Sequence, residues 1–84
     1  MDTKQLHILR HALGTGEKGT KPSYRNHFVT GENSSDYADC MTLVADGLMV
    51  HCRGNALSGG DDIFMVTDAG RVAARPERKA SANV

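Results

Sequence analysis

The sequence predicts one α/β domain of the α+β type: a helix, a short strand or turn, a second helix, a β-hairpin and a final helix. The chain has 84 residues, enough for one domain at most. Apolar residues recur at helical spacing near its start and middle. Two short β-favouring segments flank a turn-rich stretch, which is typical of a hairpin. We expect the domain to span residues 1–75 and residues 76–84 to be a disordered tail.

The first helix is expected over residues 3–13. Asp2 precedes it, and Gln5 lies three residues later, which is the spacing of a capping box. Gly14 supplies the helix stop. The residues of its apolar stripe are Leu6, Leu9 and Leu13.

Residues 14–23 hold three glycines and a proline, which predicts an exposed loop. The next segment, residues 24–30, allows two interpretations. Tyr24, Phe28 and Val29 favour a strand by propensity, and one turn of helix near the start of the segment is the competing interpretation.

A second helix is expected over residues 35–47. Ser34 or Ser35 is a suitable N-cap, and Asp36 suits the positive end of the helix dipole. Gly47 closes the helix. The apolar positions that keep helical spacing are Tyr37, Cys40, Met41, Val44 and Leu48.

The hairpin is expected to pair Leu48–Cys52 with Ile63–Thr67 across a long, turn-rich tip. Thr67 then caps a third helix. Pro76 stops that helix, because the residue before a proline is pushed out of helical space. Gly70 is expected to allow close packing of this helix on its neighbour.

The chain thus reads Gly47-Leu48-Met49, then a hairpin, then Val66-Thr67-Asp68-Ala69-Gly70. This order resembles the winged-helix (wHTH-like) domains of small bacterial and phage regulators, whose returning strand ends in Leu-Thr-x-x-Gly. The resemblance covers residues 37–74 and implies a hairpin wing and a binding role. Such regulators normally carry a further helix before the recognition helix, where this chain has residues 24–30. The segment Tyr24–Val29 is similar to small phage or prophage proteins of unknown role.

Charge is uneven along the chain although the ten basic and ten acidic residues cancel. The middle, residues 32–70, is acidic, and both ends are basic. The resemblance would make the helix at 35–47 the recognition helix, yet it has three aspartates and no Lys or Arg. Affinity for DNA comes largely from neutralised phosphates, so this helix suits a DNA groove poorly.

Our first hypothesis is therefore a non-enzymatic, phage- or prophage-type accessory or regulatory protein. It would bind a protein partner with a basic surface through an acidic face. The candidate protein-contact residues are Asp36, Asp39, Asp61 and Asp62. A solvated, charged face without a partner is the simpler reading of the same residues.

The alternative is a DNA-binding transcriptional regulator that uses the basic loop and the wing, with dimerisation to collect enough contacts. The candidate nucleic-acid contacts are Lys18, Lys21, Arg25, Arg53 and Asn55. A solvated basic loop is the simpler reading here too.

Some patterns in the sequence suggest catalysis or cofactor binding, but the flanking elements or partner residues that each needs are missing. The loop Gly14–Gly19 spells G-x-G-x-x-G, but a helix precedes it and a proline follows, so it lacks the strand-to-helix setting of a dinucleotide site. His7 and His11 have the i, i+4 spacing of metal ligands, without a Cys or carboxylate to complete the set.

A catalytic triad can be drawn from Ser58, His51 and Asp61, but no nucleophile elbow or oxyanion signature accompanies these residues. We expect no enzyme activity, no metal and no cofactor.

Two cysteines, Cys40 and Cys52, are fewer than a secreted domain of this size usually carries. Without a signal peptide or a membrane-length apolar run, we expect a cytoplasmic protein with reduced thiols and no membrane partner. Cys40 lies on the apolar stripe of its helix and is expected in the core.

Overall fold

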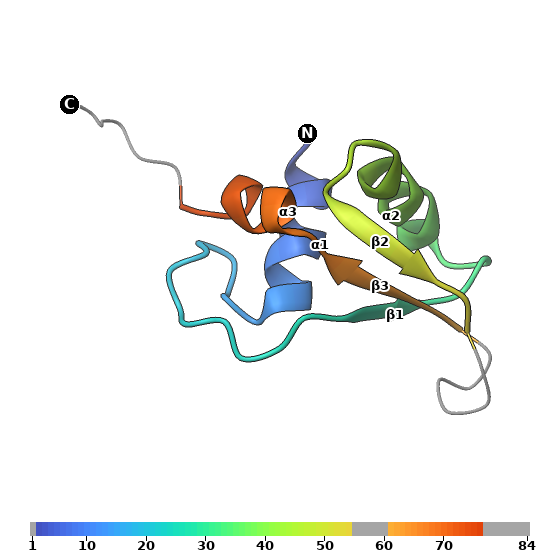
Figure 1. Cartoon of the computed structure of the whole chain (residues 1–84), viewed down its shortest axis with the longest axis horizontal. Helices are drawn as coiled ribbons and strands as arrows, with labels where there is room; N and C mark the ends of the chain where they lie inside the picture. Colours follow the sequence, from blue (N-terminus) through green and yellow to red (C-terminus); the bar gives the residue numbers. More distant parts are fainter. Residues whose placement is uncertain (1, 55–60, 77–84) are drawn as a thin grey trace.

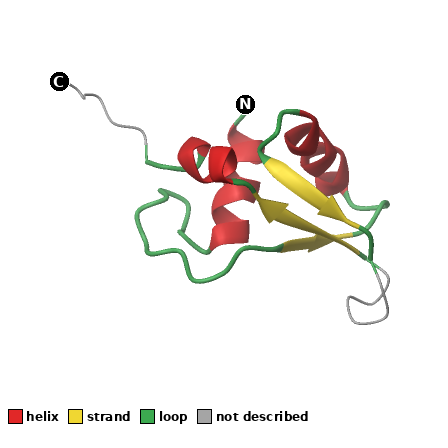
Figure 2. Cartoon of the chain, in the orientation of Figure 1, coloured by secondary structure: helices red, strands yellow, loops and turns green. Residues whose placement is uncertain are grey.

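The computed structural model describes residues 2–54 and 61–76 of the chain and confirms a small α+β domain. Its helices and strands follow one another in the predicted order (Figures 1 and 2). They are α1 (Thr3–Leu13), β1 (Phe28–Thr30), α2 (Ser35–Ala45), β2 (Met49–Cys52), β3 (Asp62–Val66) and α3 (Asp68–Ala73).

The three strands form one antiparallel sheet in the order β1-β3-β2, so β3 lies in the middle. The predicted hairpin is confirmed, because β2 pairs with β3 from Met49 opposite Val66 to Cys52 opposite Ile63. β2 begins one residue later than expected and ends at Cys52 as expected, and β3 begins and ends one residue earlier than expected. Thr67 leaves β3 because its side chain caps α3 by accepting a hydrogen bond from the Gly70 N–H at 3.0 Å.

The ambiguous segment at 24–30 contains a strand, and the competing turn of helix is wrong. Asn26 explains why the chain enters β1 in an extended path. Its Oδ1 accepts from the Val66 N–H at 2.7 Å, and its Nδ2 donates to the Val66 carbonyl at 3.1 Å. The side-chain amide thus satisfies both backbone groups of Val66, two positions beyond the last β1–β3 pair, Phe28 with Phe64.

The expected helix ends are largely confirmed. Asp2 and Gln5 form the capping box of α1, with the Gln5 N–H donating to Asp2 Oδ1 at 2.8 Å, and Gly14 ends the helix at φ +76°. Ser34 is the N-cap of α2. That helix ends two residues earlier than residue 47, because Asp46 is the C-cap and Gly47 turns the chain at φ +78°.

The core lies between the helices and one face of the sheet (Figure 1). The expectation for Cys40 is confirmed, but Leu6 is half-buried and Met41 is 37% exposed. The buried face of α1 is wider than a leucine stripe and rotated from it, and α2 points Leu43 inward instead of Met41. The buried apolar residues are Ile8, Leu9, Ala12, Leu13, Cys40, Leu43, Met49, Phe64, Val66 and Ala74.

The other face of the sheet carries side chains that alternate with the buried ones. We call it the open face. Its residues are Val29 on β1, Val50 and Cys52 on β2, and Ile63 and Met65 on β3. In Figure 1, α1 passes behind the strands, on the side of the sheet away from this face.

Close packing at Gly70 is confirmed, and it yields a stability prediction. A Cβ atom at this position would collide with the backbone oxygen of Leu48 and lie 2.6 Å from Val66 Cγ1. Because a backbone oxygen cannot swing aside, we expect Gly70→Ala to lower the free energy of unfolding by about 1–3 kcal/mol. Urea denaturation followed by circular dichroism measures this. Ala69→Ser, at the exposed neighbour, is the control, and equal midpoints for the two variants would contradict the steric argument.

Candidate binding sites

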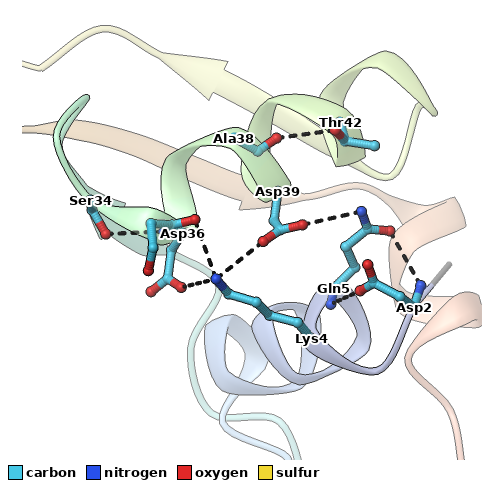
Figure 3. Close-up of polar contacts among 9 residues, drawn as sticks. Asp2, Lys4, Gln5, Ser34, Asp36, Ala38, Asp39 and Thr42 are labelled. Carbon is cyan, nitrogen blue, oxygen red and sulfur yellow. Dashed lines mark hydrogen bonds and ion pairs between the residues drawn. The ribbon is translucent and has the colours of Figure 1, made fainter.

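The first pair of predicted acidic contacts, Asp36 and Asp39, faces a cation from α1 (Figure 3). Lys4 Nζ lies 3.3 Å from Asp36 Oδ1 and 3.3 Å from Asp39 Oδ2. Gln5 Nε2 donates to the free oxygen of the Asp39 carboxylate, Oδ1, at 3.3 Å. The hydrogen bonds to Asp36 and Asp39 raise the pKa of Lys4, although its side chain is largely exposed. The α2 aspartates therefore form a mixed-charge cluster with α1 instead of a purely acidic face.

A third predicted contact, Asp62, is held by three groups near the Cys52 end of the β2–β3 hairpin. His51 Nε2 lies 2.6 Å from Asp62 Oδ2, and the Tyr37 hydroxyl donates to the same oxygen at 2.8 Å. The Gly54 N–H donates to Asp62 Oδ1 at 3.0 Å. His51 first, then Gly54 and Tyr37, lower the pKa of Asp62 to about 2. Asp62 therefore serves as an internal acceptor as well as a charge on the surface.

Sequence reasoning missed His51 and Tyr37 as partners of Asp62. The signal for His51 was present in the hairpin, since strand alternation puts a residue on the same face as its diagonal neighbour on the next strand. His51 lies opposite Phe64, so Asp62 is that diagonal neighbour. Tyr37 comes from α2 and had no such local signal. Its ring packs edge-on against Phe64, with 5.7 Å between ring centroids.

The Cys52 end of the β2–β3 hairpin, which is the expected wing, and the loop before α2 line a polar hollow of about 580 Å³, which we call the wing-end hollow. It brings Asp61 and Asp62 together with Arg53, which the sequence had assigned to nucleic acid, and adds Glu32. Its charged lining is therefore acidic on balance, with Arg53 as the cation among the described lining residues.

A second hollow, of about 400 Å³, lies between α1 and the loop that follows it; we call it the basic hollow. The structure brings Lys21 and Arg25 together here, while Lys18 lines an adjoining hollow. Arg25 Nε and Nη2 donate to the His11 carbonyl at 3.0 and 2.6 Å, and its guanidinium lies 5.1 Å from the Tyr24 ring centroid. The other charged or titratable lining residues are His7, Arg10, His11 and Glu17.

Arg10 is buried, with 8% of its surface exposed, and it ties three segments together. Its guanidinium donates to the carbonyl of Glu17 at 2.6 Å, of Ala74 at 2.9 Å and of Arg75 at 3.0 Å. The loop and the end of α3 are thereby held against α1. Sequence patterning gave no indication of this role, because an Arg on a helix usually snorkels to water.

The remaining patterns carry no assembled catalytic or metal centre among residues 2–54 and 61–76. The carboxylate partner of His51 is Asp62 rather than Asp61. Asn55 and Ser58 lie outside the described residues. His7 and His11 stack with 5.9 Å between ring centroids, and the described residues contain no cluster of three or more His, Cys, Asp or Glu side chains suited to a metal ion.

The Asp62 cluster predicts how Tyr37 titrates. The hydrogen bond to the Asp62 carboxylate, and then burial, raise the pKa of Tyr37, because both favour the neutral phenol. In a Tyr24→Phe background, absorbance near the phenolate band reports Tyr37 alone, since the chain has two tyrosines. We expect Asp62→Asn to move the midpoint to lower pH. An unchanged midpoint would mean that the hydrogen bond is absent in solution.

The same cluster predicts an acid dependence of stability. The folded state lowers the pKa of Asp62 from 3.8 to about 2. A lowered carboxyl pKa stabilises the fold above the unfolded value, and this contribution is lost as pH falls through the folded value. We expect the free energy of unfolding of the wild type to fall over this interval, and the slope to be shallower in Asp62→Asn. Identical slopes would contradict the assignment.

The described residues thus form a small α+β domain of three helices and a three-stranded antiparallel sheet. Within them, no helix combines the length and apolar character needed to cross a membrane. Comparison of the chain with protein-family models, curated proteins and solved structures finds no match.

Proposed function

We propose that this protein is a non-enzymatic binding module of the winged-helix type that contacts a protein partner with a basic surface. Three local features support the winged-helix part. Gly47 reverses the chain after α2, β2 and β3 pair antiparallel, as the strands of a wing would, and Thr67 caps the helix that follows. One feature departs from that pattern. Winged-helix regulators normally carry a further helix before the recognition helix, whereas here α2 is the one helix between β1 and β2, a span that the structure describes in full.

The observation that carries the proposal is the charge of the wing-end hollow. Glu32, Asp61 and Asp62 line it against a single cation among the described residues, Arg53. Complementary charge steers association and fixes which partner binds. An acidic rim around a hollow favours a basic protein surface over nucleic acid, since phosphates would be repelled.

The test is charge reversal at the exposed acids of this hollow. We expect intact protein to retain a basic protein from source-cell extract, and Glu32→Lys/Asp61→Lys to lose it. Glu17→Lys, an exposed acid on the loop after α1, is the matched control. Retention should also weaken as salt rises. Equal retention by the double variant and the control would contradict the proposal. Reversal of Asp36 or Asp39 is less informative, because it would put a second cation beside Lys4.

A second candidate function, DNA binding, is favoured by the basic hollow. This hollow is lined by three basic residues, Lys21, Arg25 and Arg10, and by the exposed ring of Tyr24. Glu17 is the acidic residue in the lining. Phosphate-driven affinity is greatest at low salt, so a mobility shift at about 50 mM salt is the decisive condition. This function predicts a shift that Lys18→Glu/Lys21→Glu abolishes. The absence of a shift from the wild type at that salt excludes it.

A further inference from the structure

Within β1, β2 and β3, every residue on the open face of the sheet is apolar. Val29, Ile63 and Cys52 form one row across the three strands, and Val50 and Met65 form the next row. Val29 is 44% exposed, Val50 51% and Met65 42%. Single exposed apolar residues are ordinary, whereas contiguous rows of them make this face a candidate interaction surface.

The size of this face limits what it can hold. Strands about 4.8 Å apart, with a rise of about 3.3 Å per residue, give a face about 14 Å wide and 17 Å long. A stable protein pair buries about 800 Å² on each partner, several times the area of this face. A single helix, about 10–12 Å across with its side chains, matches the width. The dimensions therefore favour one helix of a partner over the flat face of a second copy.

Charge at the two ends of the face supports the same choice. Glu32 follows β1 and Asp61 precedes β3 at one end, and Asp46 and Asp68 lie beside the strand ends at the other. All four residues are exposed. Two copies packed face to face would bring acidic ends together in either orientation, and like charges across an interface cost affinity. A helix with basic residues at both ends would be complementary, with Arg53 as the one local exception at the wing end.

We propose that the open face binds an amphipathic helix of the partner, with apolar residues at i, i+3, i+4 and i+7 and Lys or Arg at both ends. This inference rests on the proposed function, and it moves the main contact from the wing-end hollow to the open face. The apolar residues supply the buried area, and the acids at the two ends select the basic partner and set its direction.

Cys52 provides a native reporter of this contact. It is half-buried and lies on the open face, whereas Cys40 is fully buried and burial raises its thiol pKa to about 12. A thiol reagent should therefore modify Cys52 and leave Cys40 untouched in the folded protein. The probe is a synthetic helical peptide of about 14 residues, about 21 Å long, with a leucine stripe and lysines at both ends. A peptide with glutamates at its ends is the matched control.

We expect Cys52 modification to slow about tenfold when the lysine peptide is present at about ten times its dissociation constant. The glutamate peptide should give no protection at the same concentration. Val50→Lys on the open face should abolish protection, whereas Val72→Lys, at a residue 56% exposed on α3, should keep it. Both positions are exposed, so both variants should fold, and circular dichroism checks this.

Three results would overturn the inference. They are no protection by millimolar lysine peptide, equal protection by both peptides, and protection that grows with protein concentration alone, which would indicate a second copy. Its failure is distinguishable from failure of the proposed function. If Val50→Lys still retains the basic protein and Glu32→Lys/Asp61→Lys loses it, the proposed function stands and the open face is not the contact.

Discussion

Replacement of Phe64 by alanine is expected to lower the free energy of unfolding by about 3–5 kcal/mol. Phe64 is fully buried on the central strand, opposite Phe28 on one side and His51 on the other. The His51 ring stacks on it at 4.8 Å between centroids, and Tyr37 packs against its edge. Alanine would leave a cavity that the rigid strand pairing cannot close.

This loss is large for so small a domain, whose total stability is about 0.05–0.15 kcal/mol per residue. Urea denaturation followed by circular dichroism is the measurement, since the chain has no tryptophan to report unfolding. Phe28→Ala is the comparison, because Phe28 is only partly buried at the edge of the same core. A loss below about 1 kcal/mol for Phe64→Ala would mean that the core is not closely packed around this ring.

Replacement of Arg10 by methionine is expected to cost about 3 kcal/mol, the second largest effect. A hydrogen bond from a charged donor contributes about 1.5–3 kcal/mol, but the net loss is smaller than the sum over three such bonds, because the variant also removes the desolvation cost of the buried guanidinium. Methionine keeps much of the length of the side chain, so the variant mainly removes the hydrogen bonds to Glu17, Ala74 and Arg75.

The loss of stability in Arg10→Met should also be confined to the segments that Arg10 holds, and amide hydrogen exchange detects this. Amide protons in the loop after α1 and in α3 should exchange faster in Arg10→Met than those of β3. Arg25→Met is the control, since Arg25 donates to a single carbonyl, that of His11, nearer the surface. Equal destabilisation by the two variants would contradict the role of Arg10 as a tie between segments.

The parts of the fold that could be predicted from the sequence are those that depend on interactions between residues close together in the chain. The capping box of Asp2 and Gln5, the left-handed Gly14 and the cap at Thr67 each act within a few residues, and each is confirmed. The hairpin was predictable for the same reason, because its two strands adjoin one turn-rich segment.

Features that depend on distant residues were predicted only as one of two alternatives, as for the strand within residues 24–30, or were missed. The strand at Phe28–Thr30 exists because Asn26 and β1 meet Val66 and β3, some forty residues away in the chain. The buried guanidinium of Arg10 depends on carbonyls at both ends of the fold. Residue type and spacing along the chain do not predict hydrogen-bond partners that lie so far apart in the sequence.

The candidate site shows the same division. Asp36, Asp39 and Asp62 were predicted as acids of one region, but their partners Lys4 and His51 were not recognised. Lys4 comes from α1, and its meeting with α2 depends on how the two helices pack (Figure 3). The apolar outer face of the sheet was also hidden, because strand register is needed to know which side chains point together.

The position of β3 has a consequence for how the chain folds during synthesis. Of the three described strands it is the last to be made, and both others depend on it, since β1 and β2 pair with it and not with each other. Until Val66 has left the ribosome, β1 and β2 have no strand to pair with in the native sheet, and α1 lacks much of its packing surface. Domains generally fold as units as they emerge, and this one therefore has to wait for most of its chain. Before that point, a nascent chain carries unpaired strand edges that chaperones recognise or that other chains can join.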